Sequence, residues 1–232
     1  MELKRSKKTW GQIFDESVSG VDYYQRHGAP PFVNKYYDHQ LRRAFRMVIN
    51  NLEVEGKAVL EVGAGTGRWA QEFSKMNCAY YGIDFNPKAI LVARNENLPN
   101  CRFLVMDATR LAFRTQNFDL AISITAIMHI PTEGWRLAVK ELVRVVKPNG
   151  RIALIENRRY PWIEEFSKNG CELLMKRGQR YSFLRELPEG RLPLPLKLNQ
   201  LLTSLSYPLE PLFERIVPIR FAKHAILVFR KQ

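Results

Sequence analysis

Cysteine is scarce in this chain, and other features that would define a class of protein are missing as well. The three cysteines, Cys78, Cys101 and Cys171, form no CxxC or CxxxC pair, which argues against a disulfide framework or a thiolate metal site. No apolar run reaches the roughly 18 residues of a membrane-spanning helix. No apolar stretch follows the basic start at residues 1–8, as a secretory signal would require. We therefore expect a cytoplasmic protein with no metal and no transmembrane segment.

Acidic residues are outnumbered, because 23 Asp and Glu stand against 36 Lys and Arg and leave a formal net charge of +13. The excess is greatest in residues 157–232, which carry 14 basic and seven acidic side chains. A basic surface could bind RNA, DNA, an anionic membrane or an acidic protein, or could serve solubility alone. The length of 232 residues and the hydrophobic share of 46 % are typical of one globular α/β domain, with or without a cap.

Short apolar runs alternate with helical patterns through the middle of the chain. Five runs are typical of buried strands, and they cover residues 58–62, 79–83, 103–106, 118–124 and 151–156. Helices are predicted between them at about residues 68–76, 87–95 and 132–146, the last with apolar residues at helical spacing. Strands that alternate with helices predict right-handed βαβ units and a parallel sheet.

The N-terminal flank has a helical pattern of its own. Helices are expected at about residues 9–19 and 34–52, separated by a glycine- and proline-containing turn. Residues 1–52 would then form an N-terminal helical cap on a core of residues 53–232.

The C-terminal flank combines two further strands with an unusual segment between them. Strands are expected at residues 171–176 and 225–230, and the intervening residues, about 178–221, are rich in proline and leucine. Leucine at every second position from 192 to 198 predicts an extended stretch, and residues 198–205 a short amphipathic helix. This insertion is either a lid over a substrate entrance or an element that closes the core or a dimer interface.

A glycine-rich turn follows the first strand, in the run Glu61-Val62-Gly63-Ala64-Gly65-Thr66-Gly67. Glycine permits positive φ and lets the backbone approach a ligand. A dinucleotide site requires G-x-G-x-x-G, but here the third glycine comes one residue early. The Glu61 carboxylate would repel a pyrophosphate and attract a cationic ligand. A plain tight turn with a solvated Glu61 is the alternative.

Two acids stand where the second and third strands end. Asp84 could accept hydrogen bonds from ribose hydroxyls, and Asp107 could accept one from an exocyclic adenine amine. Either could also be an ordinary loop residue or helix cap. In open α/β sheets ligands bind at the carboxyl ends of the parallel strands, so the three acids together favour a nucleoside-containing ligand.

With these motifs in this order, the sequence resembles the class I S-adenosylmethionine-dependent methyltransferases, and in particular the small-molecule "type 11" domains. The resemblance rests on the glycine motif, on Gly82-Ile83-Asp84, Met106-Asp107-Ala108 and Phe118-Asp119-Leu120, and on the Lys147-Pro148-Asn149-Gly150 turn. It implies a Rossmann-like, doubly wound, seven-stranded α/β sheet that is mostly parallel, with the last strand antiparallel. Residues 171–176 and 222–230 would pair at one edge.

The resemblance also implies a set of cofactor-binding residues for S-adenosyl-L-methionine. Glycine-turn residues would line its methionine part, with Glu61 beside the amino group. Asp84 would hold the ribose, Asp107 with Ala108 the adenine, and the end of the fourth strand would pass the sulfonium. Tyr23 and Tyr24 could close over the cofactor or be core aromatics. The full set is Tyr24, Glu61, Gly63, Ala64, Gly65, Gly67, Asp84, Phe85, Asp107, Ala108 and Ile124.

The methyl acceptor is a separate question. His129, just after the fourth strand, could remove a proton from an acceptor hydroxyl or amine, or could simply pack. Relatives that methylate adenine amines, pyrimidine C5 or catechols carry motifs that are missing after the fourth strand here. RNA at other positions, lipids, small metabolites and proteins stay open as acceptors. The rival functions are a basic RNA-binding protein that keeps only the fold and a nicotinamide-dependent oxidoreductase.

Overall fold

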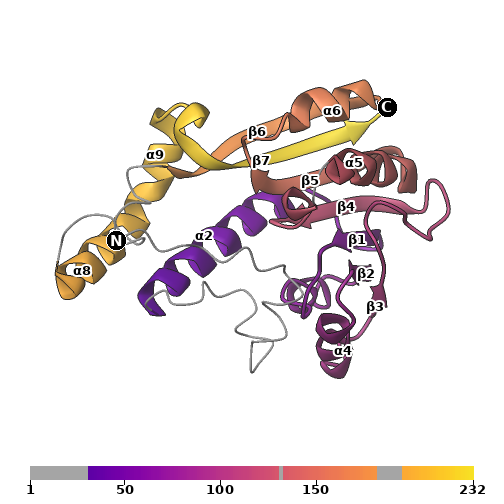
Figure 1. Ribbon diagram of the computed structural model, residues 1–232, viewed down its shortest axis with the longest axis horizontal. Coiled ribbons are helices and arrows are strands. Elements are labelled where there is room, and N and C mark those ends of the chain that lie inside the picture. The colour runs from indigo at the N-terminus through magenta and orange to yellow at the C-terminus, as the bar shows by residue number, and fades with distance from the viewer. Residues whose placement is uncertain (1–30, 131–132, 182–194) are drawn as a thin grey trace.

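A single seven-stranded sheet forms the centre of the molecule (Figure 1). The computed structural model describes residues 31–130, 133–181 and 195–232. The strands lie in the order β3-β2-β1-β4-β5-β7-β6, and β7 runs antiparallel to both β5 and β6 while the other pairs are parallel. The predicted mixed sheet and its antiparallel last strand are confirmed. The strands are β1 (Ala58–Val62), β2 (Ala79–Asp84), β3 (Cys101–Val105), β4 (Phe118–Ile124), β5 (Val146–Asn157), β6 (Cys171–Tyr181) and β7 (Ala222–Lys231).

Helices cover both faces of this sheet, as a doubly wound fold requires. One face is covered by α2 (Pro31–Ile49), α3 (Ala70–Phe73) and α4 (Pro87–Asn95), whose apolar side chains share a core with β1, β2 and β4. The other is covered by α5 (Gly134–Val145) and α6 (Trp162–Lys168). The remaining elements are η2 (Ile127–His129), α8 (Leu196–Ser206), η3 (Tyr207–Leu209), α9 (Glu210–Ile216) and η4 (Ile219–Phe221).

Local sequence explains where two of these helices lie. In α5 the side chains of Trp135, Val139 and Leu142 are buried, at the 3–4-residue spacing that puts them on one helix face. At the start of α4 the Asn86 side chain accepts hydrogen bonds from the backbone N–H groups of Lys88 and Ala89. Pro87 occupies the first helical position, where its missing N–H costs nothing.

Some predicted boundaries are wrong. The helix expected at residues 68–76 is reduced to the four residues of α3, because the chain turns at once and Asn77 adopts a positive φ of 47°. The extended stretch expected up to residue 198 is wrong at its end, because Leu196 begins α8, and residues 192–194 lie outside the described residues. Residues 178–181 of the expected insertion belong to β6, where they pair with β7.

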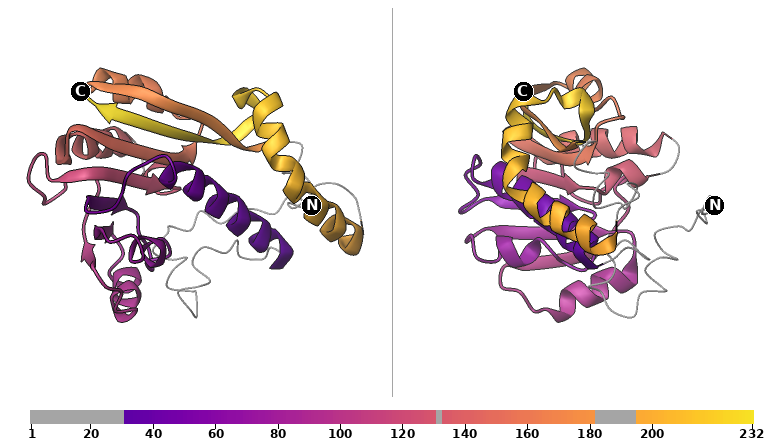
Figure 2. Two further views of the ribbon diagram at one scale, coloured as in Figure 1. Left: turned by 180° about the vertical axis from the view of Figure 1, so that it is seen from behind. Right: turned by 90° about the vertical axis from the view of Figure 1, so that its left-hand side faces the viewer.

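The rest of the insertion leaves and rejoins the sheet at its carboxyl edge. Asn157, the last residue of β5, pairs with His224 at the start of β7, so the chain before β7 lies where the parallel strands end. From there α8 and α9 project beyond the sheet, and α8 packs against α2 (Figures 1 and 2). None of the helices in the described ranges is long and apolar enough to cross a membrane.

Candidate active site

The glycine-rich turn after β1 is held tightly against two neighbouring strands. Gly63, Gly65 and Gly67 have φ values of 79°, 54° and 84°, a region that favours glycine. The N–H of Gly63 donates to the carbonyl of Ile83 in β2 at 2.8 Å. A Cβ on Gly63 would lie 2.1 Å from the Cβ of Ala126, in the loop after β4. The turn therefore forms a backbone-lined surface at the carboxyl edge, between β2 and β4.

Glu61 lies at the base of this turn and is buried. The Tyr80 hydroxyl donates a hydrogen bond to its carboxylate. Burial, with a smaller contribution from the nearby Asp84 carboxylate, raises the pKa of Glu61 to about 8 in spite of that bond. A ligand cation at this position would favour the ionised form of Glu61.

Asp84 ties the glycine turn to the end of β2. One of its carboxylate oxygens accepts the N–H of Gly65 at 3.0 Å, and the other accepts the N–H of Asn86 at 2.9 Å. Burial raises the pKa of Asp84, and these backbone bonds oppose the rise. The structure thus brings Asp84, the turn and Glu61 together, as the sequence suggested, whereas the next residue, Phe85, is 59 % exposed.

The other predicted cofactor residues lie on neighbouring strand ends. Asp107 follows β3 at the surface, where its carboxylate accepts both the N–H and the hydroxyl of Thr109 at 2.8 Å. Ala108 comes next, half-buried. The N–H of Met106 donates to the carbonyl of Asp84, which holds the ends of β3 and β2 together. Ile124 is the buried last residue of β4.

The structure describes the predicted base, His129, but not the two tyrosines predicted to close over the cofactor. His129 ends η2 at the surface after β4, and surrounding protein atoms desolvate the imidazole and lower the pKa of His129. The imidazole is therefore neutral near pH 7, and a pKa of about 4 makes it a weak base. Tyr23, Tyr24 and the helix expected at residues 9–19 lie outside the described residues.

A buried glutamate at the end of β5 was not found by the sequence analysis. Glu156 accepts the Ser123 hydroxyl at 2.7 Å and the N–H groups of Ala126 and Ile127 at 2.9 and 3.2 Å, all on one oxygen. Its other oxygen, Oε2, is buried without a hydrogen-bond partner. Burial raises the pKa of Glu156 to about 7. Glu156 thus shapes the loop that meets Gly63, through partners that no local motif reveals.

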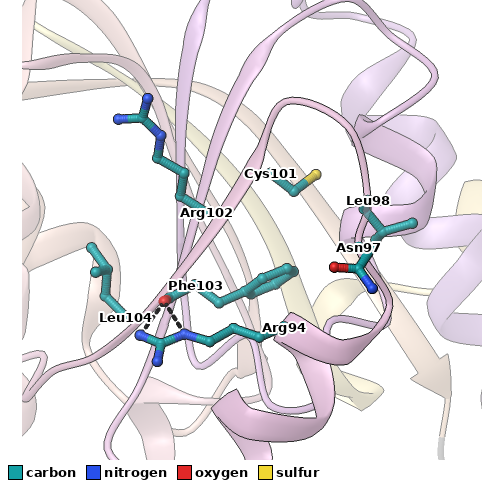
Figure 3. A pocket seen from close by; sticks show the side chains of 7 residues that line it. All are labelled: Arg94, Asn97, Leu98, Cys101, Arg102, Phe103 and Leu104. Carbon is teal, nitrogen blue, oxygen red and sulfur yellow. Dashed lines mark hydrogen bonds between the residues drawn. The ribbon is translucent and has the colours of Figure 1, made fainter.

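A surface hollow elsewhere does not belong to this site. It lies beside the edge strand β3, and its lining consists of Arg94, Asn97, Leu98, Cys101, Arg102, Phe103 and Leu104 (Figure 3). The Arg94 guanidinium donates two hydrogen bonds, of 2.9 and 2.8 Å, to the carbonyl of Phe103. The hollow is at the amino-terminal end of β3, whereas the acids gather at the carboxyl edge. Among the described residues no cluster of His, Cys, Asp and Glu could hold a metal.

Comparison with known proteins identifies the fold and a domain within the chain. Residues 59–150, which contain the glycine turn, Asp84, Asp107 and His129, match the family described as "Methyltransferase domain". The chain therefore contains a methyltransferase domain over these residues. A solved S-adenosylmethionine-dependent methyltransferase from Aquifex aeolicus has the same fold as this chain, with a TM-score of 0.55 at 15 % identity over 85 % of this chain and 97 % of that one.

Curated relatives of this chain act on different kinds of acceptor, judged by their names. It is 34 % identical over 111 residues to "Probable tRNA methyltransferase 9B" of Mus musculus, which covers 47 % of this chain and 23 % of that protein. It is 30 % identical over 148 residues to a phthiotriol/phenolphthiotriol dimycocerosates methyltransferase of Mycobacterium leprae, 61 % of this chain and 54 % of that one. The match therefore spans about half or less of each relative.

Proposed function

We propose that this chain binds S-adenosyl-L-methionine at the carboxyl edge of β1 and β2 and transfers its methyl group to an oxygen or nitrogen acceptor. One observation carries the proposal: the hydrogen bond from Gly65 to Asp84, which joins the glycine turn to the acid after β2, next to the buried Glu61. The carboxylate of Glu61 can bind an ammonium group, and the backbone of the turn can line a methionine chain. The carboxylate of Asp84 can accept hydrogen bonds from a ribose.

The residues present fit this cofactor. The turn at Gly63 has no room for a Cβ, so only backbone faces a ligand there. We assign Glu61 to the amino group, Asp84 with Phe85 to the ribose, and Asp107 with Ala108 to the adenine. The remaining assignments are Gly63, Ala64, Gly65 and Gly67 for the methionine part, Ile124 beside the sulfonium, and Tyr24 as part of a cover. When bound, the cofactor supplies an electrophilic methyl group, and the chain's part is to align the acceptor with it.

The acceptor side of the proposal rests on the elements beyond β4 and β5. The loop at Ala126, shaped by Glu156, and the helices α8 and α9 all lie at the same carboxyl edge. We propose that α8 and α9 form a lid on the acceptor entrance. A cytoplasmic location is part of the proposal, supported by the three cysteines, all of which are free thiols.

Calorimetry separates this function from its rivals. We expect S-adenosylhomocysteine to bind the chain and NAD not to bind, whereas an oxidoreductase would reverse the two results. Mass spectrometry of cell extracts treated with the protein and a labelled methyl donor then identifies the acceptor. If S-adenosylhomocysteine binds but no fraction of the extract gains label, RNA included, the result would favour a protein that keeps the fold without methyl transfer.

Replacement of Asp84 by Ala is expected to weaken S-adenosylhomocysteine binding by about 1–3 kcal/mol, because a charge-assisted hydrogen-bond acceptor is lost. Calorimetry measures the effect. Asp119→Ala is the matched control, because Asp119 accepts the Ala58 N–H and pairs with Lys147 at the start of β1 and β4, away from the carboxyl edge. Equal affinity in Asp84→Ala and the unsubstituted chain would remove Asp84 from the cofactor site.

His129→Ala tests the proposed base. We expect S-adenosylhomocysteine affinity to stay the same, because His129 lies on the loop after β4 rather than at the glycine turn. Methyl transfer to the identified acceptor should fall about 10²–10⁴-fold if the imidazole takes a proton. His129→Gln, which keeps a polar side chain without basicity, should be equally slow. A normal rate in both variants rejects the general-base role and leaves packing.

A further inference from the structure

Helix α8 buries polar side chains and exposes apolar ones. Its buried residues are polar, with Asn199 3 % and Thr203 1 % exposed, and the side-chain oxygen of Asn199 has no hydrogen-bond partner. Its solvent face carries Leu198, Leu201 and Leu205, which are 41 %, 55 % and 57 % exposed. Those three leucines follow i, i+3, i+7 spacing and so form one stripe opposite the buried face. A helix that packs its polar side inward is built for an apolar environment on its outer side.

The apolar stripe continues through α9. Leu209, Leu212 and Ile216 repeat the i, i+3, i+7 spacing and are 47 %, 52 % and 69 % exposed. Together with Leu196, the segment of residues 196–216, here the leucine arm, holds seven of the 12 exposed large hydrophobic residues of the described chain. Single exposed leucines need no explanation, but this concentration marks an interaction surface.

Cations flank the stripe. Lys197 on α8 and Arg215 on α9 are both exposed, but the sequence of the arm also contains Glu210 and Glu214, so its own charges balance. The excess of cations lies where the arm rejoins the sheet: Arg220 on η4 is exposed, and so are Arg158 and Arg159, which follow β5. Residues 157–232 as a whole carry 14 basic against seven acidic side chains. An exposed apolar stripe with cations beside it complements an anionic lipid surface, where acyl chains take up the leucines and headgroups pair with the cations.

We propose that the leucine arm docks this protein on the surface of an anionic lipid bilayer. The arm lies in the interface, because α8 and α9 have only 11 and seven residues and neither could span the hydrocarbon core. The arm ends next to η4 and β7 at the carboxyl edge of the sheet, so docking brings that edge toward the membrane (Figure 2).

The breaks in the arm argue against a coiled coil with a second copy of the chain as its cover, because η3 separates α8 from α9. Pro208 and Pro211 interrupt the arm, which a continuous coiled coil would not tolerate. RNA is a poorer match, because leucine offers neither charge to phosphate nor an aromatic face to bases.

Vesicle co-sedimentation of the full chain tests the proposal. We expect binding to vesicles of equal parts phosphatidylcholine and phosphatidylglycerol at least about tenfold tighter than to phosphatidylcholine alone. The double variant Leu201→Ser/Leu205→Ser should bind the anionic vesicles at least about tenfold more weakly. The double variant Leu91→Ser/Leu137→Ser removes two leucines that are 59 % and 51 % exposed on α4 and α5, and it should bind like the unsubstituted chain.

Thermal unfolding of both double variants checks that each is folded, and none of these readouts depends on a methyl donor. Equal vesicle binding by the two double variants would overturn the proposal, as would no binding by the unsubstituted chain. Sedimentation velocity without lipid provides a further way to overturn it. A dimer that becomes a monomer only in Leu201→Ser/Leu205→Ser would show that a second copy covers the arm. A loss of tRNA binding in that variant, without any vesicle binding by the parent, would assign the arm to RNA.

Discussion

Gly63→Ala is expected to destabilise the fold by about 2–5 kcal/mol, which sums the cost of a left-handed backbone and that of overpacking. The added Cβ would lie 2.1 Å from the Cβ of Ala126, and the backbone φ of 79° already disfavours any residue with a Cβ. Relief requires the β1 turn and the loop after β4 to move apart. The same movement would displace the surface to which we assign the methionine part of the cofactor, so S-adenosylhomocysteine binding should be lost.

Gly56→Ala is the matched control for this substitution. Gly56 has a comparable φ of 69°, but a Cβ there would meet nothing within 4 Å. It should therefore show only the backbone cost of about 1–2 kcal/mol and normal cofactor affinity. Urea unfolding and calorimetry of the two variants separate strain from steric contact. If both variants lose the same stability and keep the same affinity for S-adenosylhomocysteine, the close approach of Gly63 to Ala126 does not contribute to cofactor binding.

The sequence predicted the sheet and the glycine turn because their signals are local. Glu61, Gly63 and Asp84 sit at strand ends whose apolar runs are unambiguous, and the order of parallel strands brings strand ends to one edge. The roles of all the assigned cofactor-binding residues stay predictions, those of Asp107 and Ile124 included. The structure gives Asp107 a local partner, Thr109, which is also what an ordinary turn would show.

Two features could not be predicted because they depend on residues far apart in the chain. The partners of Glu156 lie about 30 residues away, on β4 and the loop after it, so nothing near Glu156 distinguishes it from an acid at a strand end. Up to residue 198 the alternate leucines predicted an extended stretch. The structure has a helix there instead, and its residues Asn199 and Thr203 are buried. Tertiary context has therefore overridden a local pattern.

Glu156→Ala is expected to destabilise the chain by about 3 kcal/mol or more, because the buried hydroxyl of Ser123 and the N–H groups of Ala126 and Ile127 lose their common acceptor. Glu156→Gln keeps a carbonyl oxygen at that position and should cost about 1 kcal/mol or less at pH 5. Urea unfolding at that pH measures both variants. The difference between them is the combined cost of losing the shared acceptor and the side-chain volume.

The pH dependence of the same pair tests the charge on Glu156. Folding raises the pKa of Glu156 from 4.5 to about 7, so the folded chain binds this proton more tightly than the unfolded chain does. Its contribution to stability is fully present below pH 4.5 and is lost as the pH rises through about 7, an effect of up to about 3 kcal/mol. Glu61, with a pKa raised to about 8, acts in the same direction.

Glu156→Gln should therefore lose less stability than the unsubstituted chain between pH 5 and pH 8, and the decline that remains should be due mainly to Glu61. Near pH 8 the Gln variant should equal or exceed the parent in stability, because it no longer has to hold a carboxylate whose Oε2 is buried without a hydrogen-bond partner. Parallel pH profiles of the two proteins would show that Glu156 is already ionised and compensated at pH 5. In that case Glu156 would accept the three bonds as a charged carboxylate rather than as a neutral acid.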